Sequence, residues 1–190
     1  MPEKLAIDPK RTALLVMDVQ SQIVGRYPAA EGGYLATLAS AVDAARASGI
    51  KVIYVIVLFR KGHPEIAPTN QMFSALKAGG QLIDDKVHPK VAPHDGELVV
   101  VKKRVSAFAG SDLQVILSAH DINHLILTGI ATSGVVLSTL RQAADLDYRL
   151  SVIADCCLDG DAEVHAVLTG KVFPRQASVM DAEAFITGLK

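Results

Sequence analysis

Two ionisable side chains stand where apolar segments of this sequence end. Asp18 follows the apolar segment 12–17, and Lys102 closes the segment 97–102. Because a carboxylate is costly to desolvate, Asp18 is expected either to cap a loop or to take part in catalysis. Lys102 is expected either to extend into solvent or to reach Asp18 and tune its proton affinity. If the two side chains meet, they provide a general acid with a charged neighbour.

A glycine-containing loop follows a third apolar segment, 124–128. Gly129 permits a sharp exit from a strand, and Thr132 or Ser133 can cap a following helix. Backbone amides at such a turn offer a site to an oxyanion or a carboxylate. The sequence contains no GxGxxG, and two valines rather than Lys and Ser or Thr follow Gly134. Neither a dinucleotide site of that type nor a phosphate-binding loop is therefore indicated.

Apolar segments alternate with helical patterns along the chain, and this alternation positions the residues above. Strands are expected at 12–17, 51–58, 97–102, 124–128, 150–154 and 177–180, and helices at 31–48, 70–77, 111–120, 132–145, 161–171 and 182–189. The pattern predicts one α/β domain over residues 1–190, a three-layer α/β/α sandwich around a mostly parallel, six-stranded Rossmann-like sheet. Ligands bind beyond the carboxyl ends of such strands, where Asp18, Lys102 and Gly129 stand.

An irregular stretch rich in Pro, Gly and His, 59–96, lies between the second and third strands. So long a loop is usually functional, and we expect it to form a wall or lid of a pocket. Arg60 would either grip an anionic substrate group or lie exposed in the loop. Phe59, Phe73 and Phe108 are expected either to line the pocket or to pack in the core.

The overall composition is that of a globular protein with little net charge. Half of the 190 residues are apolar, and 19 basic against 20 acidic residues leave a formal charge of −1. This balance argues against nucleic acid as a partner. Residues 1–4 and the short apolar run that follows lack the features of a signal peptide or a membrane span. The adjacent Cys156 and Cys157 cannot form a disulfide framework, which favours a reducing cytoplasm.

Three ordered motifs resemble those of the isochorismatase-like superfamily, which includes nicotinamidases, N-carbamoylsarcosine amidases and isochorismatases. They are Asp18-Val19-Gln20, Lys102 four positions before Ser106-Ala107-Phe108, and Gly129-Ile130-Ala131-Thr132. Their order, and that of the expected strands and helices, fits the superfamily over nearly the whole chain. The resemblance therefore implies a three-layer α/β/α sandwich, which is the fold that the alternation of strands and helices also predicts.

The resemblance also implies roles for motif residues. Asp18 and Lys102 would be catalytic, and Gln20 would position the substrate. In the third motif, Ile130, Ala131 and Thr132 would form a pocket for the substrate or an oxyanion. The peptide bond between Ile130 and Ala131 would be a non-proline cis bond.

The nucleophile of the amidase branch is absent from this chain. Its cysteine lies six positions after the motif glycine, where this sequence has Val135, and an isopropyl group cannot attack a carbonyl. Cys156 and Cys157 follow a different strand, and Ser133 stands two residues short of the position. Isochorismatases also dispense with the cysteine and protonate a vinyl ether that water then hydrolyses, but they have a glycine there. The chain matches neither branch fully.

Three functions remain open. The first is a metal-independent hydrolase, without a cofactor, that uses Asp18, Lys102 and water on a small anionic metabolite; the scattered histidines lack the spacing of metal ligands. The second is a catalytically silent ligand-binding or assembly protein, suggested by Val135. The third is an amide (C–N) hydrolase with another nucleophile, such as Cys156 or Cys157. The resemblance and the many small and apolar residues of 131–144 also predict a homodimer or homotetramer.

Overall fold

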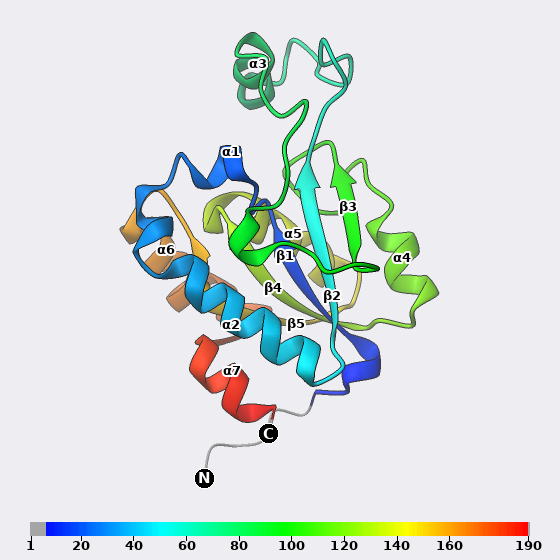
Figure 1. The fold of residues 1–190 in the computed structure, drawn as a ribbon, viewed down its shortest axis with the longest axis vertical. Helices are drawn as coiled ribbons and strands as arrows, with labels where there is room; N and C mark the ends of the chain where they lie inside the picture. Colours follow the sequence, from blue (N-terminus) through cyan, green and yellow to red (C-terminus); the bar gives the residue numbers. More distant parts are fainter. Residues whose placement is uncertain (1–6, 190) are drawn as a thin grey trace.

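A parallel sheet of six strands runs through the middle of the fold, in a computed structural model that describes residues 7–189 (Figure 1). The strand order is β3-β2-β1-β4-β5-β6, and all neighbours pair in parallel. The strands are β1 (Thr12–Met17), β2 (Lys51–Val57), β3 (Leu98–Lys102), β4 (His124–Ile130), β5 (Arg149–Leu158) and β6 (Ser178–Met180). The predicted sheet is confirmed and is wholly parallel. Residues 1–4, where no leader segment is expected, lie outside the described range.

Helices cover both faces of the sheet and confirm the three layers. They are α1 (Ser21–Val24), α2 (Tyr34–Ala47), α3 (Gln71–Ala78), α4 (Leu113–Ala119), α5 (Leu137–Asp145), α6 (Ala162–Val167) and α7 (Ala182–Gly188). Alternate residues of β1 pack against α2 and α7 on one face and against α4 and α5 on the other. All of β1 is buried, as a strand covered on both faces must be. Within residues 7–189, no helix has both the length and the apolar character that crossing a bilayer requires.

The winding of the chain reverses between β1 and β4. β1 leads to β2 and β3 on one side, whereas β4 leads to β5 and β6 on the other. The connections that leave the carboxyl ends of β1 and β4 therefore run in opposite directions and leave a crevice between them. Such a crevice is the usual ligand site of these sheets. Asp18 leaves β1 at this point, and Ile130 ends β4 there.

Two elements beside this crevice differ from their expected bounds. β5 is longer than 150–154, because its register against β4 shifts near Gly129 and pairing then continues to the end of β4. The helix expected at 132–145 begins with a wide turn, Thr132–Val136, which is non-helical at Gly134 and only then continues as α5. Both irregularities interrupt a regular pattern where the chain approaches the crevice.

The segment between β2 and α3 and its return form a projection above the carboxyl edge of the sheet (Figure 1). We call residues 59–85 the α3 lobe. Asn70 caps α3 by accepting a hydrogen bond of 3.1 Å from the Phe73 amide. Buried apolar side chains hold the lobe to the sheet: Val57, Phe59, Ile66, Phe73 and Leu82. The expected wall over the crevice is therefore a folded lobe with its own small core.

Some of the small and apolar residues between 131 and 144 are buried, whereas others, such as Leu137 and Ala144, are only partly buried. Val136, Leu140 and Ala143 are buried in the same core as β1 and β4. These three side chains cover the sheet, so an apolar face offered to a partner by this segment would consist of its partly buried residues.

Candidate active site

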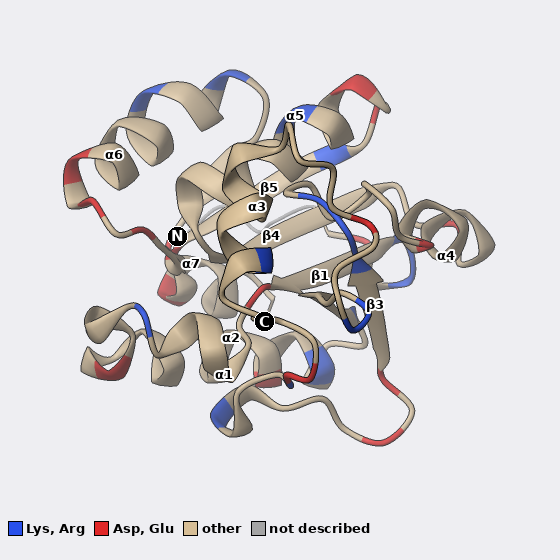
Figure 2. Ribbon diagram, turned by 90° about the horizontal axis from the view of Figure 1, so that it is seen from above, with Lys and Arg blue, Asp and Glu red and all other residues tan. Residues whose placement is uncertain are grey.

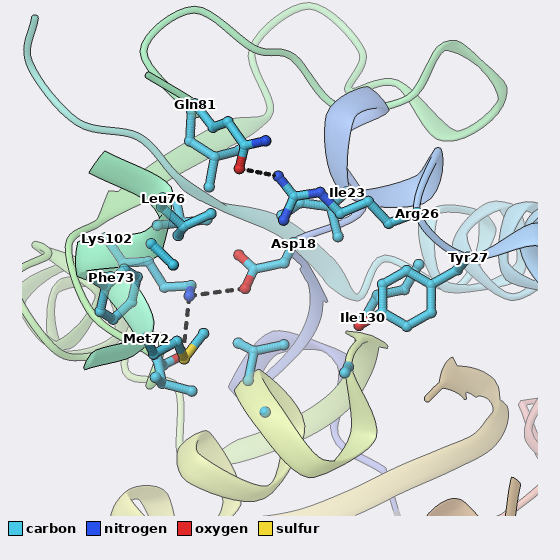
Figure 3. Close-up of a pocket in the computed structure, with 17 residues that line it drawn as sticks. Asp18, Ile23, Arg26, Tyr27, Met72, Phe73, Leu76, Gln81, Lys102 and Ile130 are labelled. Atoms are coloured by element: carbon cyan, nitrogen blue, oxygen red, sulfur yellow. Dashed lines mark hydrogen bonds and ion pairs between the residues drawn. The ribbon is translucent and has the colours of Figure 1, made fainter. Parts of the chain in front are cut away.

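A cavity of about 390 Å³ opens at the carboxyl edge of the sheet, beneath the α3 lobe. Figure 2 looks down on this edge, around which acidic and basic positions are scattered rather than separated by sign. The cavity is lined from all three sequence motifs, by Asp18, Lys102, Ile130, Ala131 and Val135 (Figure 3). Its volume is typical of sites for small molecules. The crevice thus brings together Asp18, Lys102 and the third motif, as predicted from the sequence.

Asp18 and Lys102 form an ion pair inside the protein. Lys102 Nζ lies 2.9 Å from Asp18 Oδ2, and the two side chains are 2% and 9% exposed. Asp18 has a φ of 56°, in the left-handed region that is unusual for a residue other than glycine. Its amide donates to Val55 O at 2.8 Å, which holds the residue to β2 as the chain leaves β1. This turn presents the carboxylate to the cavity.

The surroundings of Asp18 raise its affinity for a proton above that of an ordinary aspartate. Burial raises the pKa of the Asp18 carboxyl above its usual value, while the charge and the hydrogen bond of Lys102 offset part of that rise. Asp18 Oδ1 is buried and has no hydrogen-bond partner among the described residues. Buried carboxylate oxygens are rarely left in this state. Oδ1 is therefore the atom through which Asp18 can exchange a proton with a bound molecule.

Gly129 brings β4 close enough to β1 for the third motif to stand beside Asp18. Its φ is +139°, and a Cβ built on it would lie 2.1 Å from Met17 O. Any side chain would therefore collide with the backbone of β1. The following peptide bond, between Ile130 and Ala131, is cis, which confirms the prediction from the resemblance.

The described lining of the cavity lacks the hydroxyl and thiol side chains that most often act as nucleophiles in hydrolases. Val135 is only 2% exposed and contributes its surface to the wall next to Gly134. Among the described residues that form the lining there is no Cys, Ser or Thr. The position that holds a thiol in the amidase branch is thus filled by an apolar side chain in contact with the site.

Both cysteines lie away from the cavity, in the cores on opposite faces of the sheet. Cys156 packs in the core beneath α2 and Cys157 in the core beneath α5. Burial raises the pKa of Cys157 to about 12 and also raises the pKa of Cys156. Thiols in this environment stay protonated near neutral pH and are poor nucleophiles. The structure therefore does not bring either thiol to the expected site.

Thr132 and Ser133 anchor the third motif instead of contacting the cavity. The buried Thr132 Oγ1 lies 2.9 Å from His165 Nδ1 of α6. The Ser133 amide donates to Asp159 Oδ2 at 2.7 Å. These contacts tie the wide turn to the connection between β5 and α6, so the structure places Thr132 behind the cavity lining, where it supports the turn.

Gln20 serves the sheet rather than the cavity. Its side chain accepts a hydrogen bond of 2.7 Å from the Val57 amide and donates to Val57 O at 3.2 Å. It also donates to Asp85 Oδ2 at 3.2 Å, and the residue is fully buried. The structure therefore places Gln20 outside the cavity lining, with a partner within the protein for every polar atom of its amide.

The three other residues expected to bind substrate also lie outside the lining. Phe59 packs against Phe73 in the core of the α3 lobe, with ring centroids 5.5 Å apart. Phe108 packs against Tyr148 beside α5. Arg60 has a side chain that is 74% exposed and pairs with Glu65 at 2.7 Å. Of the expected aromatic residues, Phe73 is the one that reaches the cavity.

Several lining residues were not anticipated from the sequence. Ile23, Arg26 and Tyr27 come from α1 and the turn after it, and Leu76 and Gln81 come from the α3 lobe. The first three follow Asp18 by only five to nine positions in the sequence. A chain that leaves β1 at the crevice must pass along its rim, so this proximity was a usable signal. The lobe residues carried no comparable signal.

The donor atoms around the cavity do not suit a metal ion. Among the described residues that line the cavity, only Asp18 carries a carboxylate, and that carboxylate is already paired with Lys102. No histidine lines the cavity, and among residues 7–189 no three His, Cys, Asp or Glu side chains are grouped as a metal site requires. His63 is buried in the α3 lobe, where its Nε2 lies 2.7 Å from Gln81 O.

Comparisons with known proteins agree with this fold. The sequence model of the isochorismatase domain matches residues 12–184. The chain is 32% identical to the ureidoacrylate amidohydrolase RutB of Serratia proteamaculans, an alignment that covers 97% of this chain and 81% of the relative. It is also 32% identical to RutB of Stutzerimonas stutzeri, with the same coverage.

Solved structures extend the comparison. An isochorismatase family protein from Burkholderia thailandensis is 26% identical, with a TM-score of 0.79 over 96% of this chain and 97% of the other. A cysteine hydrolase from Pseudomonas syringae pv. phaseolicola shares the fold, with a TM-score of 0.87 at 21% identity over 96% and 94% of the two chains. The chain therefore belongs to the isochorismatase family of hydrolases.

Proposed function

We propose that this protein hydrolyses a small metabolite with water as the nucleophile and with Asp18 and Lys102 as its catalytic pair. The proposal needs neither a metal ion nor a covalent bond between substrate and protein. One observation carries it: the free Oδ1 of the buried Asp18 belongs to a cavity whose described lining contains no Cys, Ser or Thr. This arrangement supports proton transfer by Asp18 to or from a bound molecule.

In the first form of the reaction, Asp18 starts as a carboxylic acid. It donates its proton to the leaving group as the bond to that group breaks, the protonated leaving group departs, and water traps the remaining cation. The water loses a proton to the Asp18 carboxylate as the new C–O bond forms, so Asp18 is restored. Lys102 stabilises the carboxylate that exists between the two transfers.

In the second form, Asp18 starts as a carboxylate and the scissile bond is C–N. This version is favoured by the relatives named ureidoacrylate amidohydrolase, which align with 97% of this chain. Asp18 would take a proton from water, the water oxygen would add to the carbonyl, and Asp18 would then protonate the leaving nitrogen. Val135 is compatible with this route, because no thiol takes part.

The test is turnover of isochorismate, nicotinamide, ureidoacrylate and an N-carbamoyl amino acid by the wild-type protein and by Asp18→Asn. We expect one substrate to be hydrolysed and the variant to lose at least about 10²-fold in rate. The Cys156→Ala/Cys157→Ala protein is the matched control and should retain wild-type turnover. Dialysis against EDTA should likewise leave the rate unchanged.

The intact mass of the protein during a single turnover separates direct hydrolysis from covalent catalysis, and ¹⁸O-labelled water shows that the new oxygen of the product comes from water. A single turnover in labelled water should place the label in the product, and the intact mass of the protein should stay that of the free chain throughout. A protein-bound intermediate in the mass spectrum contradicts the proposal. Saturable binding of a substrate without any product would instead support the silent ligand-binding alternative.

We also propose that the chain forms a homodimer or homotetramer. Two exposed valines, Val99 on the edge strand β3 and Val115 on α4, border one surface depression and are 43% and 71% exposed. A second copy could cover this apolar edge. Light scattering that gives the mass of one chain contradicts this proposal.

A further inference from the structure

The charges that line the cavity are not equivalent. Lys102 Nζ donates to Arg104 O at 2.8 Å and to Val105 O at 3.0 Å, and it pairs with Asp18 Oδ2 at 2.9 Å. These three acceptors use every N–H of the ammonium group. Lys102 therefore neutralises Asp18 and has no donor left for a negatively charged group of a ligand.

Arg26 is the other cation among the described lining residues, and its surroundings are different. Its Nη2 donates to Gln81 Oε1 at 2.7 Å, which is a bond to a neutral amide. No carboxylate of residues 7–189 lies within ion-pair distance of its guanidinium. By contrast, Arg46 and Arg60 are each paired with a glutamate. Arg26 is itself exposed, so it brings to the rim of the cavity a hydrated positive charge that no described carboxylate within ion-pair distance offsets.

The position of Arg26 suits contact with a bound molecule. Its side chain reaches from the turn after α1 toward the α3 lobe, so that the guanidinium lies next to Gln81, with the Asp18 carboxylate facing the same space (Figure 3). Apolar side chains, such as Ile23, Leu76 and Val135, provide the surface between and around these polar groups. The cavity therefore has a reactive end, an apolar wall and a separate cationic end.

We propose that Arg26 recognises a carboxylate of the substrate, and that Gln81 holds the guanidinium in place for it. A guanidinium binds a carboxylate through two parallel hydrogen bonds, and its planar fork is well matched to that group. The substrate class is thus a small carboxylate with an apolar body whose hydrolysable bond reaches Asp18. This last part rests on the proposed function, whereas carboxylate binding at Arg26 does not. Arg60, the arginine expected from the sequence to bind an anion, is tied to Glu65 outside the cavity.

Binding of two inert probes tests this proposal without any need for turnover. Butyrate carries a carboxylate, and 1-nitropropane is its uncharged counterpart of the same shape. Titration of ¹⁵N-labelled protein, followed by NMR shifts that include the Arg26 side chain, gives the Kd of each probe. We expect wild-type protein to bind butyrate more tightly than 1-nitropropane and Arg26→Gln to lose about 10- to 100-fold for butyrate alone.

Three further variants control the interpretation. Arg60→Gln removes an exposed positive charge outside the cavity and should leave both Kd values unchanged. Arg26→Lys keeps the charge and should recover part of the butyrate affinity. Gln81→Met removes the partner of Arg26 but not its charge, so it should weaken butyrate binding less than Arg26→Gln does.

Two results would overturn the proposal. One is wild-type protein that binds butyrate no better than 1-nitropropane, or does not bind it at all. The other is an equal loss for both probes in Arg26→Gln and Gln81→Met, which would show that the Arg26–Gln81 bond only closes the α3 lobe over the cavity. Failure of the proposed function appears separately, as an absence of hydrolysis in a protein that still binds butyrate through Arg26.

Discussion

Lys102 and Asp18 are joined by a contact of 2.9 Å in a place that solvent barely reaches. Each side chain makes the burial of the other tolerable, because an isolated charge at this depth would cost far more than a pair does. The two residues come from β3 and from the end of β1, with β2 between them in the sheet. The pair therefore links the folding of three strands to the chemistry of the cavity.

This coupling can be measured as a double-mutant cycle on the free energy of unfolding. Asp18→Asn leaves the Lys102 ammonium without its counter-charge and should destabilise the fold by about 3–5 kcal/mol. Asp18→Asn/Lys102→Met removes both charges and should cost less than the sum of the two single changes. Urea denaturation at neutral pH gives the three values, and additive losses would show that the pair is not coupled.

The pH dependence of catalysis distinguishes the two forms of the proposed reaction. Burial raises the pKa of Asp18, and Lys102 opposes that rise. If Asp18 is the acid, kcat/KM should fall as the pH increases through this raised pKa; if it is the base, kcat/KM should increase over the same range. Lys102→Met removes the opposing effect, so the same limb should move to higher pH in the residual activity of that variant. If the pH at which kcat/KM changes is the same in Lys102→Met as in the wild type, the titrating group is not Asp18.

Val135→Cys should place a reactive thiol in the cavity. Val135 contributes to the lining, whereas Cys156 and Cys157 are buried in the cores. We expect iodoacetamide to modify the variant once in its folded state and to leave the wild type unmodified, as seen by intact mass. The change removes little volume and should cost less than about 1.5 kcal/mol of stability. Equal labelling of both proteins would show that the native cysteines are accessible.

Gly129→Ala should be poorly tolerated because of the backbone of β1. The new Cβ would lie 2.1 Å from Met17 O, in addition to the strain at a φ of +139°. We expect a loss of more than about 3 kcal/mol, or failure to fold. Gly32→Ala is a suitable control, since a Cβ added to Gly32 would meet no other atom within 4 Å. Similar melting temperatures for the two variants would contradict the close approach of β1 and β4.

His124 should make stability depend on pH far from the cavity. It is buried at the amino end of β4, with its Nε2 2.9 Å from Ser151 Oγ, and burial together with nearby Arg149 lowers its pKa to about 4. The unfolded chain takes up this proton near the ordinary value, so stability is lost as the pH falls from that value toward 4. Between pH 7 and pH 5 the loss should be about 2 kcal/mol. His124→Asn should remove this part of the pH dependence in urea denaturation.

The sheet and the Asp18–Lys102 contact could be predicted because parallel strands deliver their carboxyl ends to one edge. Gln20 could not be placed in the same way. Two positions apart on a regular strand, Asp18 and Gln20 would face the same side, but the left-handed conformation of Asp18 ends that alternation. Gln20 consequently turns to Val57 and Asp85, and Asp18 alone faces the cavity.

The cationic end of the cavity escaped prediction for a related reason. Arg60 follows a strand directly and resembled a site residue, yet its nearest acceptor is Glu65 in the same lobe. Arg26 reaches the cavity because the α3 lobe folds back over α1 and supplies Gln81 as its partner. Contacts between two irregular segments so far apart in sequence leave no periodic pattern to read.

Gln20 also explains how the sheet accommodates a cavity at its centre. Beyond Met17 the backbone of β1 turns away, and β2 would be left with an unpaired amide and carbonyl at Val57. The carboxamide of Gln20 supplies both missing partners, so that a side chain takes the place of the next peptide group of β1. The side chain of Gln20 therefore continues the pairing of β1 with β2, although the main chain of β1 has already turned away. The crevice opens at this point, and the backbone groups of β2 keep their hydrogen bonds.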